Sequence, residues 1–177
     1  VGDTRVEHEL YIVALGRMAR ASLKLATSSL EKNEHKLSPQ ERQAAWATLA
    51  LPASTQLSAD AHDYWLKAGS APLSREAQQW KARTALRRAD WQLLRATIEA
   101  MPEAVRRDQA WLYWQARALQ ATGGNPQESR ELYEHIADQG TFYGQLALEE
   151  LGRMVVEPPP GPPPTAVELA PMQANQG

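Results

Sequence analysis

The chain of 177 residues contains no cysteine, a single phenylalanine and no long apolar run. The absence of cysteine excludes disulfides and thiolate metal sites, although it does not identify the compartment. Every apolar run is shorter than the ~20 residues that a membrane-spanning helix requires, so no transmembrane segment is expected. The formal net charge is −2, which provides no global basic field for binding nucleic acid or an anionic membrane.

Sequence motifs for several common chemistries are also missing. The chain has neither GxGxxG nor GxxxxGK[ST], the loops that hold nucleotide phosphates. Its histidines, His8, His35, His62 and His135, are far apart and form no HExxH pair, and no GxSxG segment supports a serine nucleophile. We therefore expect no cofactor and no metal. The chain also has no initiator methionine and no apolar leader, which suggests a processed protein or a piece of a longer one.

The residues that are abundant predict a protein made of helices. Ala, Leu, Glu, Gln and Arg are frequent, and no alternating run of β-branched residues predicts a strand. Capping-box sequences predict helix starts at Thr4, Ser38 and Asn125, and Ser74 and Asp90 are further candidate caps. Together with the glycine and proline stops, the caps predict helices over residues 5–32, 39–50, 58–68, 75–88, 91–101, 107–122, 126–139 and 142–152.

Tryptophan reveals a repeat along the chain. Trp46, Trp80 and Trp114 follow one another at a spacing of 34 residues, and Leu57 and Trp91 keep this spacing in the expected partner helices. A period of ~34 residues is typical of solenoids of helical hairpins of the tetratricopeptide kind, although the consensus itself is not met. We therefore predict an all-α fold, a right-handed α-superhelix or solenoid of antiparallel hairpins that share one continuous core.

Two aromatic segments could form either a contact surface or part of the core. On the helix expected over 107–122, Trp111 and Trp114 lie on one apolar stripe, which favours the core. Tyr113 falls off this stripe and is the better candidate for an exposed ring that contacts a substrate or a partner.

The second aromatic segment begins the last helix. Phe142 and Tyr143 are expected to wedge into the preceding hairpin, and Tyr143 is also a candidate contact residue. Gly144 has no Cβ, so another backbone could approach closely there. Packing is the favoured interpretation of this segment, and a direct ligand role is the alternative.

Three segments in order carry a family resemblance: WKARTALRRADWQLLRATIEAMP (80–102), RRDQAWLYWQARALQATG (106–123) and FYGQLALEELG (142–152). Over about residues 74–152 the chain resembles the α-superhelical region of the soluble lytic murein transglycosylases. The resemblance implies a periplasmic protein of Gram-negative bacteria. The family cleaves the bond between N-acetylmuramic acid and N-acetylglucosamine in peptidoglycan and forms a 1,6-anhydro sugar, without cofactor or metal. The matching residues are Trp80, Arg83, Trp91, Pro102, Trp111, Trp114, Arg117, Phe142, Gly144 and Gly152.

The chain departs from the family in its catalytic residues. The catalytic glutamate of the family stands in a Glu-Ser-x-Phe context, in a lysozyme-like domain that follows the superhelix. Here Glu128-Ser129 is followed by Arg and Glu, and Met172-Gln173 stands in a Pro-rich tail, so we assign catalysis to neither. The resemblance implies that residues 1–152 form the C-terminal part of a larger superhelical domain. It also implies a Pro-rich linker over 153–177 and a catalytic domain beyond residue 177, which leaves this chain inactive alone.

Three functions are compatible with the sequence. The first is a non-catalytic scaffold that positions the catalytic domain and contacts peptidoglycan. The second is a free-standing tetratricopeptide-like adaptor that binds a protein partner in its concave groove. The third is an enzyme complete within these residues, for which no motif is present. Resemblance favours the first.

Overall fold

The computed structural model describes residues 3–153, and within this range it contains helices and no strand. The all-α prediction is confirmed for these residues. The expected Pro-rich linker over 153–177 lies outside the described residues apart from Arg153. The helices are α1 (Asp3–Ala21), α2 (Leu23–Asn33), α3 (Pro39–Thr55), α4 (Ala61–Ala68), α5 (Arg75–Arg87), α6 (Trp91–Glu99), α7 (Glu103–Arg106), α8 (Gln109–Ala121), α9 (Pro126–Ala137) and α10 (Phe142–Glu150), with a short 3₁₀ helix η1 (Glu34–Lys36) after α2.

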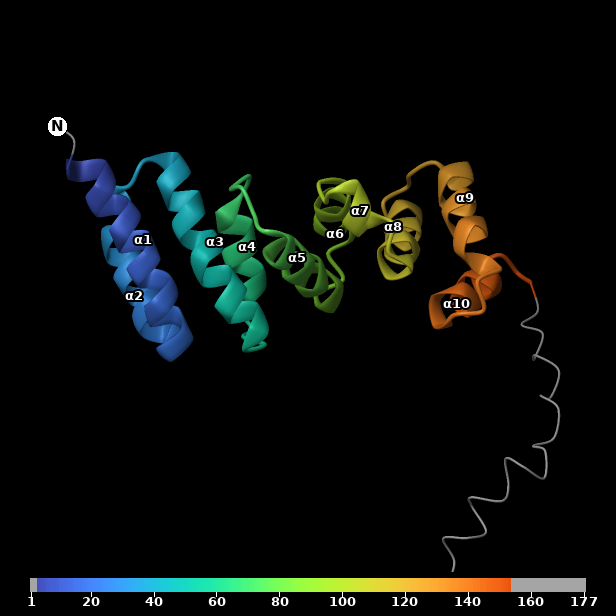
Figure 1. Cartoon of the computed structure of the whole chain (residues 1–177), viewed down its shortest axis with the longest axis horizontal. Coiled ribbons are helices and arrows are strands. Elements are labelled where there is room, and N and C mark those ends of the chain that lie inside the picture. Colours follow the sequence, from blue (N-terminus) through green and yellow to red (C-terminus); the bar gives the residue numbers. More distant parts are fainter. Residues whose placement is uncertain (1–2, 154–177) are drawn as a thin grey trace, which may run out of the picture.

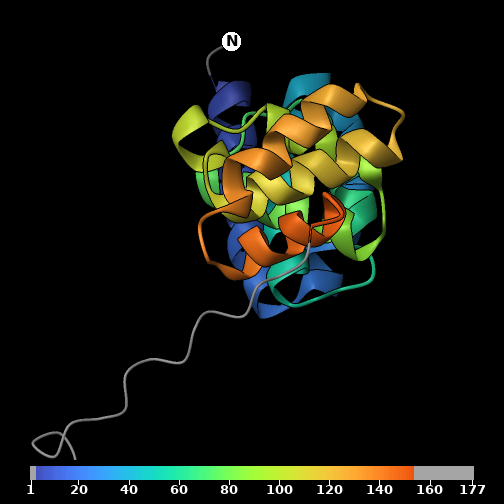
Figure 2. The same ribbon diagram turned by 90° about the vertical axis from the view of Figure 1, so that its right-hand side faces the viewer.

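The helices form hairpins that follow one another along the long axis of the molecule (Figure 1). The hairpins are α1 with α2, α3 with α4, α5 with α6 and α8 with α9, and α10 folds back against α9 and α8. Figure 2 looks down the long axis and shows α9 and α10 in front, with the other helices behind them. This arrangement agrees with the predicted solenoid of hairpins, and its right-handed superhelical turn stays a prediction.

The contacts between hairpins change along the row. In the first half, α1 contacts α3 and α3 contacts α5, so the first helices of successive hairpins pack together. In the second half, α8 packs mainly against α6, the second helix of its neighbouring hairpin. The buried side chains accordingly divide into three successive clusters, and Trp114 packs against both the second and the third. The predicted continuous core therefore takes the form of three successive clusters, because the hairpins do not all pack through the same helices.

The tryptophan repeat marks equivalent helices, as predicted. Trp46, Trp80 and Trp114 lie on α3, α5 and α8, the first helices of three hairpins. Leu57 was expected in the partner helix, and this is wrong. It lies in the loop between α3 and α4 with a positive φ of 56° and an exposed side chain.

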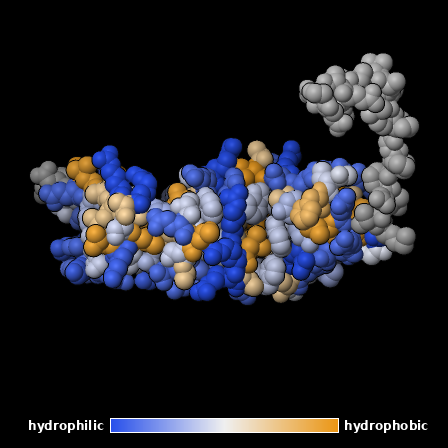
Figure 3. Space-filling model, turned by 90° about the horizontal axis from the view of Figure 1, so that it is seen from below, coloured by the Kyte–Doolittle hydropathy of each residue, from blue (hydrophilic) through white to orange (hydrophobic). Residues whose placement is uncertain are grey.

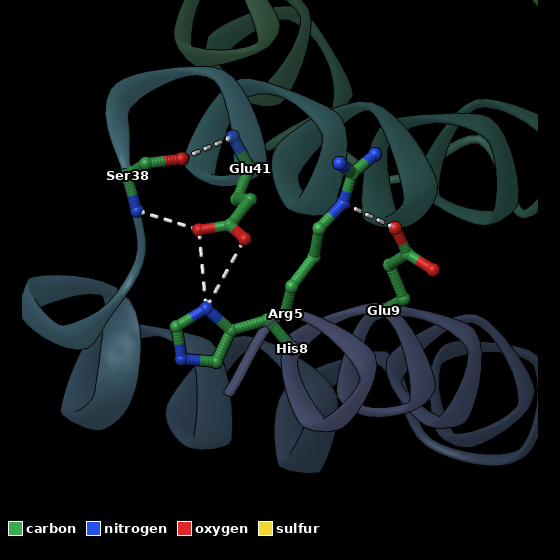
Figure 4. A network of polar contacts seen from close by, with 5 residues as sticks. All are labelled: Arg5, His8, Glu9, Ser38 and Glu41. Carbon is green, nitrogen blue, oxygen red and sulfur yellow. Dashed lines mark hydrogen bonds and ion pairs between the residues drawn. The ribbon is translucent and has the colours of Figure 1, made fainter. Parts of the chain in front are cut away.

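Several predicted helix starts are confirmed by hydrogen bonds. Glu41 N donates to Ser38 Oγ at 3.3 Å, and Ser38 N donates to Glu41 Oε2 at 2.8 Å, which completes a capping box (Figure 4). His8 of α1 meets the same carboxylate at 3.1 Å, so this cap also joins α1 to α3. The backbone hydrogen bond from Ser38 lowers the pKa of Glu41, and His8 adds to this effect. The side chains of Ser74, Asp90 and Asn125 cap α5, α6 and α9.

The first predicted helix is interrupted, and its predicted cap is wrong. α1 already includes Thr4, so Thr4 is not a cap, and Ser22 separates α1 from α2 with extended φ and ψ of −154° and 99°. The Ser22 side chain accepts a hydrogen bond from Leu25 N and begins α2. The break lets α2 fold back on α1, which buries Leu15 and Leu30 in one cluster. This gain depends on tertiary packing, and the local sign of the break is the capping residue Ser22 itself.

The second predicted helix was expected to end before Pro52, and it continues to Thr55. Proline removes one helical hydrogen bond and crowds the preceding turn. Here the extra turn buries Ala53 and Ser54, which have 0% and 1% of their surface exposed. This burial offsets the loss of the helical hydrogen bond.

Candidate functional site

One surface hollow brings together the contact candidate Tyr143 and three of the motif residues that the sequence singled out. It lies between α5, α8 and α10 and has a volume of about 270 Å³. We call it the Arg83 groove. Four of its residues, Arg83, Trp111, Trp114 and Tyr143, were identified from the sequence, and the others went unnoticed because nothing in the sequence links α5 to the start of α8. The groove is lined by Gln79, Arg83, Leu86, Asp108, Ala110, Trp111, Trp114 and Tyr143.

Arg83 provides the positive charge of the groove. Its guanidinium carbon lies 5.2 Å from the ring centroid of Trp80 and 5.8 Å from that of Trp111, so the cation is held between two aromatic side chains. One guanidinium nitrogen donates to Gln79 Oε1 at 3.4 Å. Among the side chains that the structure describes, no carboxylate forms an ion pair with Arg83. The planar guanidinium therefore keeps N–H donors available to a ligand.

Asp108 provides the negative charge of the groove. It is the N-cap of α8, and its Oδ1 accepts a hydrogen bond from Ala110 N at 2.9 Å. An ionised carboxylate has two oxygens with about four lone-pair sites, so Asp108 can accept further bonds while it caps the helix. The groove thus combines a donor, an acceptor and aromatic rings.

Tyr113, predicted to be an exposed ring, is buried with 3% of its surface exposed, so that prediction is wrong. Its ring centroid lies within 5.2–5.8 Å of those of Trp114, Tyr133 and Tyr143. The error arises because α9 and α10 cover the side of α8 that lies away from the tryptophan stripe, so α8 is buried on two sides. Tyr113 is therefore part of the core rather than a contact surface.

Arg117 is one of the motif residues and joins α8 to α10. It donates to Tyr113 Oη at 3.1 Å and to Glu150 Oε1 at 2.9 Å. The hydrogen bond with Tyr113 raises the pKa of Arg117, and Glu150 adds to this effect. Burial also raises the pKa of the neighbouring Tyr133 hydroxyl, which donates to Gln120 Oε1 at 2.8 Å. These groups hold the wall behind the groove in place.

The start of α10 combines a confirmed prediction with a wrong one. A Cβ on Gly144 would lie 2.8 Å from the carbonyl oxygen of Ile136, so the expected close backbone approach is confirmed. Tyr143 packs against the third cluster as expected and also reaches the groove. Phe142 does not wedge into the preceding hairpin, because as the first residue of α10 it points outward with 67% of its surface exposed.

The remaining motif residues have structural roles. Trp91 begins α6 and packs against the second cluster, while Pro102 precedes the short helix α7. Gly152 ends α10 with a positive φ of 70°, and its N–H donates to the carbonyl oxygen of Glu149.

The structure gives no catalytic geometry to the Glu-Ser pair at 128–129. Glu128 is exposed in the first turn of α9, whereas Ser129 is buried and donates to the carbonyl oxygen of Ala116 at 3.1 Å. Met172 and Gln173 lie outside the described residues. Within the described part of the chain, no three His, Asp or Glu side chains gather as a potential metal site. No helix between residues 3 and 153 has both the length and the apolar character needed to cross a membrane.

Comparison with solved structures finds a lytic transglycosylase. The crystal structure of an inactive mutant of lytic transglycosylase Slt from Pseudomonas aeruginosa matches 81% of this chain with a TM-score of 0.62 and 26% sequence identity. The chain resembles a helical region of a soluble lytic transglycosylase. This confirms the resemblance drawn from the motifs. The matched part is 24% of the Pseudomonas chain, so this chain spans about a quarter of that protein's length. No protein-family model and no curated protein matches.

Proposed function

We propose that this chain is a non-catalytic helical scaffold within a periplasmic soluble lytic transglycosylase that cleaves peptidoglycan glycan strands with a 1,6-anhydromuramic product. The observation that carries the proposal is the match to the Pseudomonas lytic transglycosylase over 81% of the chain. Its support from the sequence is the order of the family motifs over residues 74–152. The reaction itself is assigned to a lysozyme-like domain outside this chain.

The acidic residue of the Arg83 groove supports a non-catalytic role. Cleavage of a glycosidic bond needs a carboxylic acid that is held beside the leaving oxygen. Asp108, the carboxylate among the residues that line the groove, is exposed, and its Oδ1 accepts the helix-capping bond from Ala110 N. Asp108 thus caps α8, and the groove does not enclose it in the way that an acid catalyst requires.

The outer face of α1 supports the expectation that these hairpins continue in a longer superhelix. Val6, Leu10 and Val13 follow one another at spacings of four and three residues, and their exposed fractions are 54%, 64% and 57%. They lie opposite the buried face of α1, and Figure 3 shows apolar surface at this end of the molecule. The terminal repeats of solenoids usually present a polar outer face. An additional hairpin packed on α1 in the way that α1 packs on α3 would bury these side chains.

The proposal is tested with purified peptidoglycan sacculi. This chain and a version extended through the downstream domain are incubated separately with sacculi, and soluble products are analysed by mass spectrometry for 1,6-anhydromuropeptides. We expect product from the extended protein alone, and none when its catalytic glutamate is replaced by glutamine. Product from this chain would overturn the non-catalytic assignment, and Glu128 would then be the first residue to replace. Absence of product from both would favour the adaptor.

A further inference from the structure

We propose that the Arg83 groove binds one uncharged N-acetylated sugar unit of the glycan strand. The identity of the polymer rests on the proposed function, whereas the class of ligand, an uncharged saccharide, follows from the groove itself. Three properties of the groove support this assignment: its aromatic surface, its polar groups and its size.

The aromatic surface is larger than folding alone requires. Trp114 and Tyr143 are only partly buried where they line the groove. Phe142 does not line the groove, but it has 67% of its surface exposed and lies edge-on to Tyr143, which does, with ring centroids 5.2 Å apart. Sugar rings carry apolar C–H faces and polar edges, and aromatic side chains with an apolar face and a polar tip suit such ligands. An exposed phenylalanine next to this hollow therefore has a use in binding that it lacks in packing.

The polar groups favour a neutral ligand with both donors and acceptors. Arg83 has guanidinium N–H donors free for a carbonyl or hydroxyl oxygen, and Asp108 can accept from a hydroxyl or an amide N–H. Gln79 lines the same hollow, accepts a hydrogen bond from Arg83, and can act toward a ligand as donor or acceptor. One positive and one negative charge balance each other across the hollow. An acidic peptide would face Asp108, whereas the hydroxyl and acetamido groups of an amino sugar can use all three side chains.

The size of the groove limits the contact to a short stretch of ligand. Its volume of about 270 Å³ is slightly below the ~300–1,000 Å³ of pockets that enclose drug-sized molecules. It can take about one sugar residue while the strand continues outside. We expect dissociation constants of about 0.1–1 mM for a short oligosaccharide, because few groups are immobilised and little surface is buried. Several such contacts along one glycan strand would bind more tightly than each contact alone, because the first contact raises the effective concentration of the strand at the others.

Binding is tested by titrating the isotope-labelled 177-residue chain with N-acetylglucosamine tetrasaccharide and, separately, with peptide-free peptidoglycan strands, followed by NMR. We expect shifts of the indole N–H signals of Trp111 and Trp114 and of the side-chain amide of Gln79. Arg83→Ala should weaken binding by about tenfold, as expected from the loss of one charge-assisted hydrogen bond. Phe142→Ala should weaken it by about threefold.

Matched controls separate binding from folding. Arg87→Ala removes another exposed arginine of α5, outside the groove, and Leu66→Ala removes another exposed apolar side chain. Both should bind as the unmodified chain does, and circular dichroism should confirm that all four variants fold. Equal affinity of Arg83→Ala and Arg87→Ala would overturn the assignment of the groove, as would the absence of any shift.

A third ligand, the free stem peptide, decides the ligand class. Binding of the peptide in place of both saccharides would overturn the saccharide assignment and favour a peptide-binding groove. The two proposals can fail separately. Saccharide binding without anhydro product from the extended protein would refute the proposed function alone, whereas product without saccharide binding would refute only the assignment of the Arg83 groove.

Discussion

Trp46 and Trp114 occupy the same position in the 34-residue repeat and have different surroundings. Trp46 on α3 has 1% of its surface exposed, its Nε1 donates to Glu34 Oε2 at 2.9 Å, and Lys67 Nζ lies 4.0 Å from its ring centroid. Trp114 on α8 is half-buried and lines the Arg83 groove. One repeated residue is therefore a core residue in the first half of the molecule and a groove wall in the second.

The packing between hairpins explains this difference. In the first half, α1, α3 and α5 contact one another in series, and η1 provides Glu34 to cover Trp46. In the second half, α8 packs against α6, and the Arg83 groove lies between α5 and α8. A change in which helices touch has thus opened a groove without a change in the period of the sequence.

Replacing the two tryptophans provides the largest test of this comparison. Trp46→Ala removes a fully buried aromatic side chain and should lower the free energy of unfolding by about 3–5 kcal/mol. Trp114→Ala should lower it by about 1–2 kcal/mol, because part of its ring is already in contact with water. Urea denaturation followed by circular dichroism measures both. Equal losses would refute the distinction between core and groove wall.

Buried serines provide a second test. Ser54 Oγ accepts from Trp65 Nε1 at 2.8 Å and lies 3.0 Å from Thr84 Oγ1, so two other side chains depend on it. Ser129 in the second half makes one bond, to the carbonyl oxygen of Ala116. Ser54→Ala should therefore cost about 1–3 kcal/mol, because it leaves the Trp65 N–H buried without a partner, and Ser129→Ala about 1 kcal/mol. Thermal denaturation measures the difference. A larger loss of stability for Ser129→Ala than for Ser54→Ala would contradict the hydrogen-bond network around Ser54.

The residues that follow the first helix of three hairpins give a third test. Leu57, Ala89 and Gly123 all adopt positive φ, at 56°, 53° and 68°, and only the last is glycine. Because a left-handed conformation costs a non-glycine residue about 1–2 kcal/mol, Leu57→Gly and Ala89→Gly should each stabilise the protein by up to ~1 kcal/mol. Gly123→Ala should destabilise it by about 1 kcal/mol, because no atom lies within 4 Å of the added Cβ and the cost is conformational. Urea denaturation midpoints measure these changes in stability. Midpoints that shift in the opposite directions would show that other contacts decide the stability at these positions.

The caps of the second helices give the smallest effect, which depends on pH. The backbone hydrogen bond from Leu93 lowers the pKa of Asp90 below its ordinary 3.8, and the contact with His62 adds to this effect. A carboxylate with a lowered pKa stabilises the fold above pH ~4, and this contribution disappears as the pH falls through the lowered pKa. Asn125 caps α9 with a neutral side chain.

Stability is therefore measured from pH 6 down to pH 2 for the unmodified chain and for Asp90→Asn. We expect the variant to lose less stability on acidification, by about 0.5–1 kcal/mol. Asn125→Asp should introduce the same dependence at the other hairpin. Parallel curves of stability against pH for all three proteins would show that the charge at position 90 does not contribute to stability.

Local signals in the sequence predicted much of the fold. Ser38, Ser74 and Asp90 mark helix starts because each side chain satisfies a backbone N–H a few residues ahead, whatever lies around it. Gly144 marks a close backbone approach for an equally local reason, its missing Cβ. The order of the motifs was sufficient to indicate the lytic transglycosylase resemblance.

The candidate site was only partly predictable. The sequence placed Trp111 and Trp114 on one face of α8, but it could not show that Arg83 would lie over Trp111 from another helix. It also placed Tyr113 away from the tryptophan stripe without showing that α10 would cover it.

The sequence by itself determined the helical class, the hairpin period and most caps, because these depend on residues within one or two turns of each other. The tertiary structure decided the break at Ser22, the burial of Tyr113, the exposure of Phe142 and the opening of the Arg83 groove. Each of these depends on which helix packs against which. That choice is set by the total apolar surface buried between distant segments, a quantity that no local pattern contains.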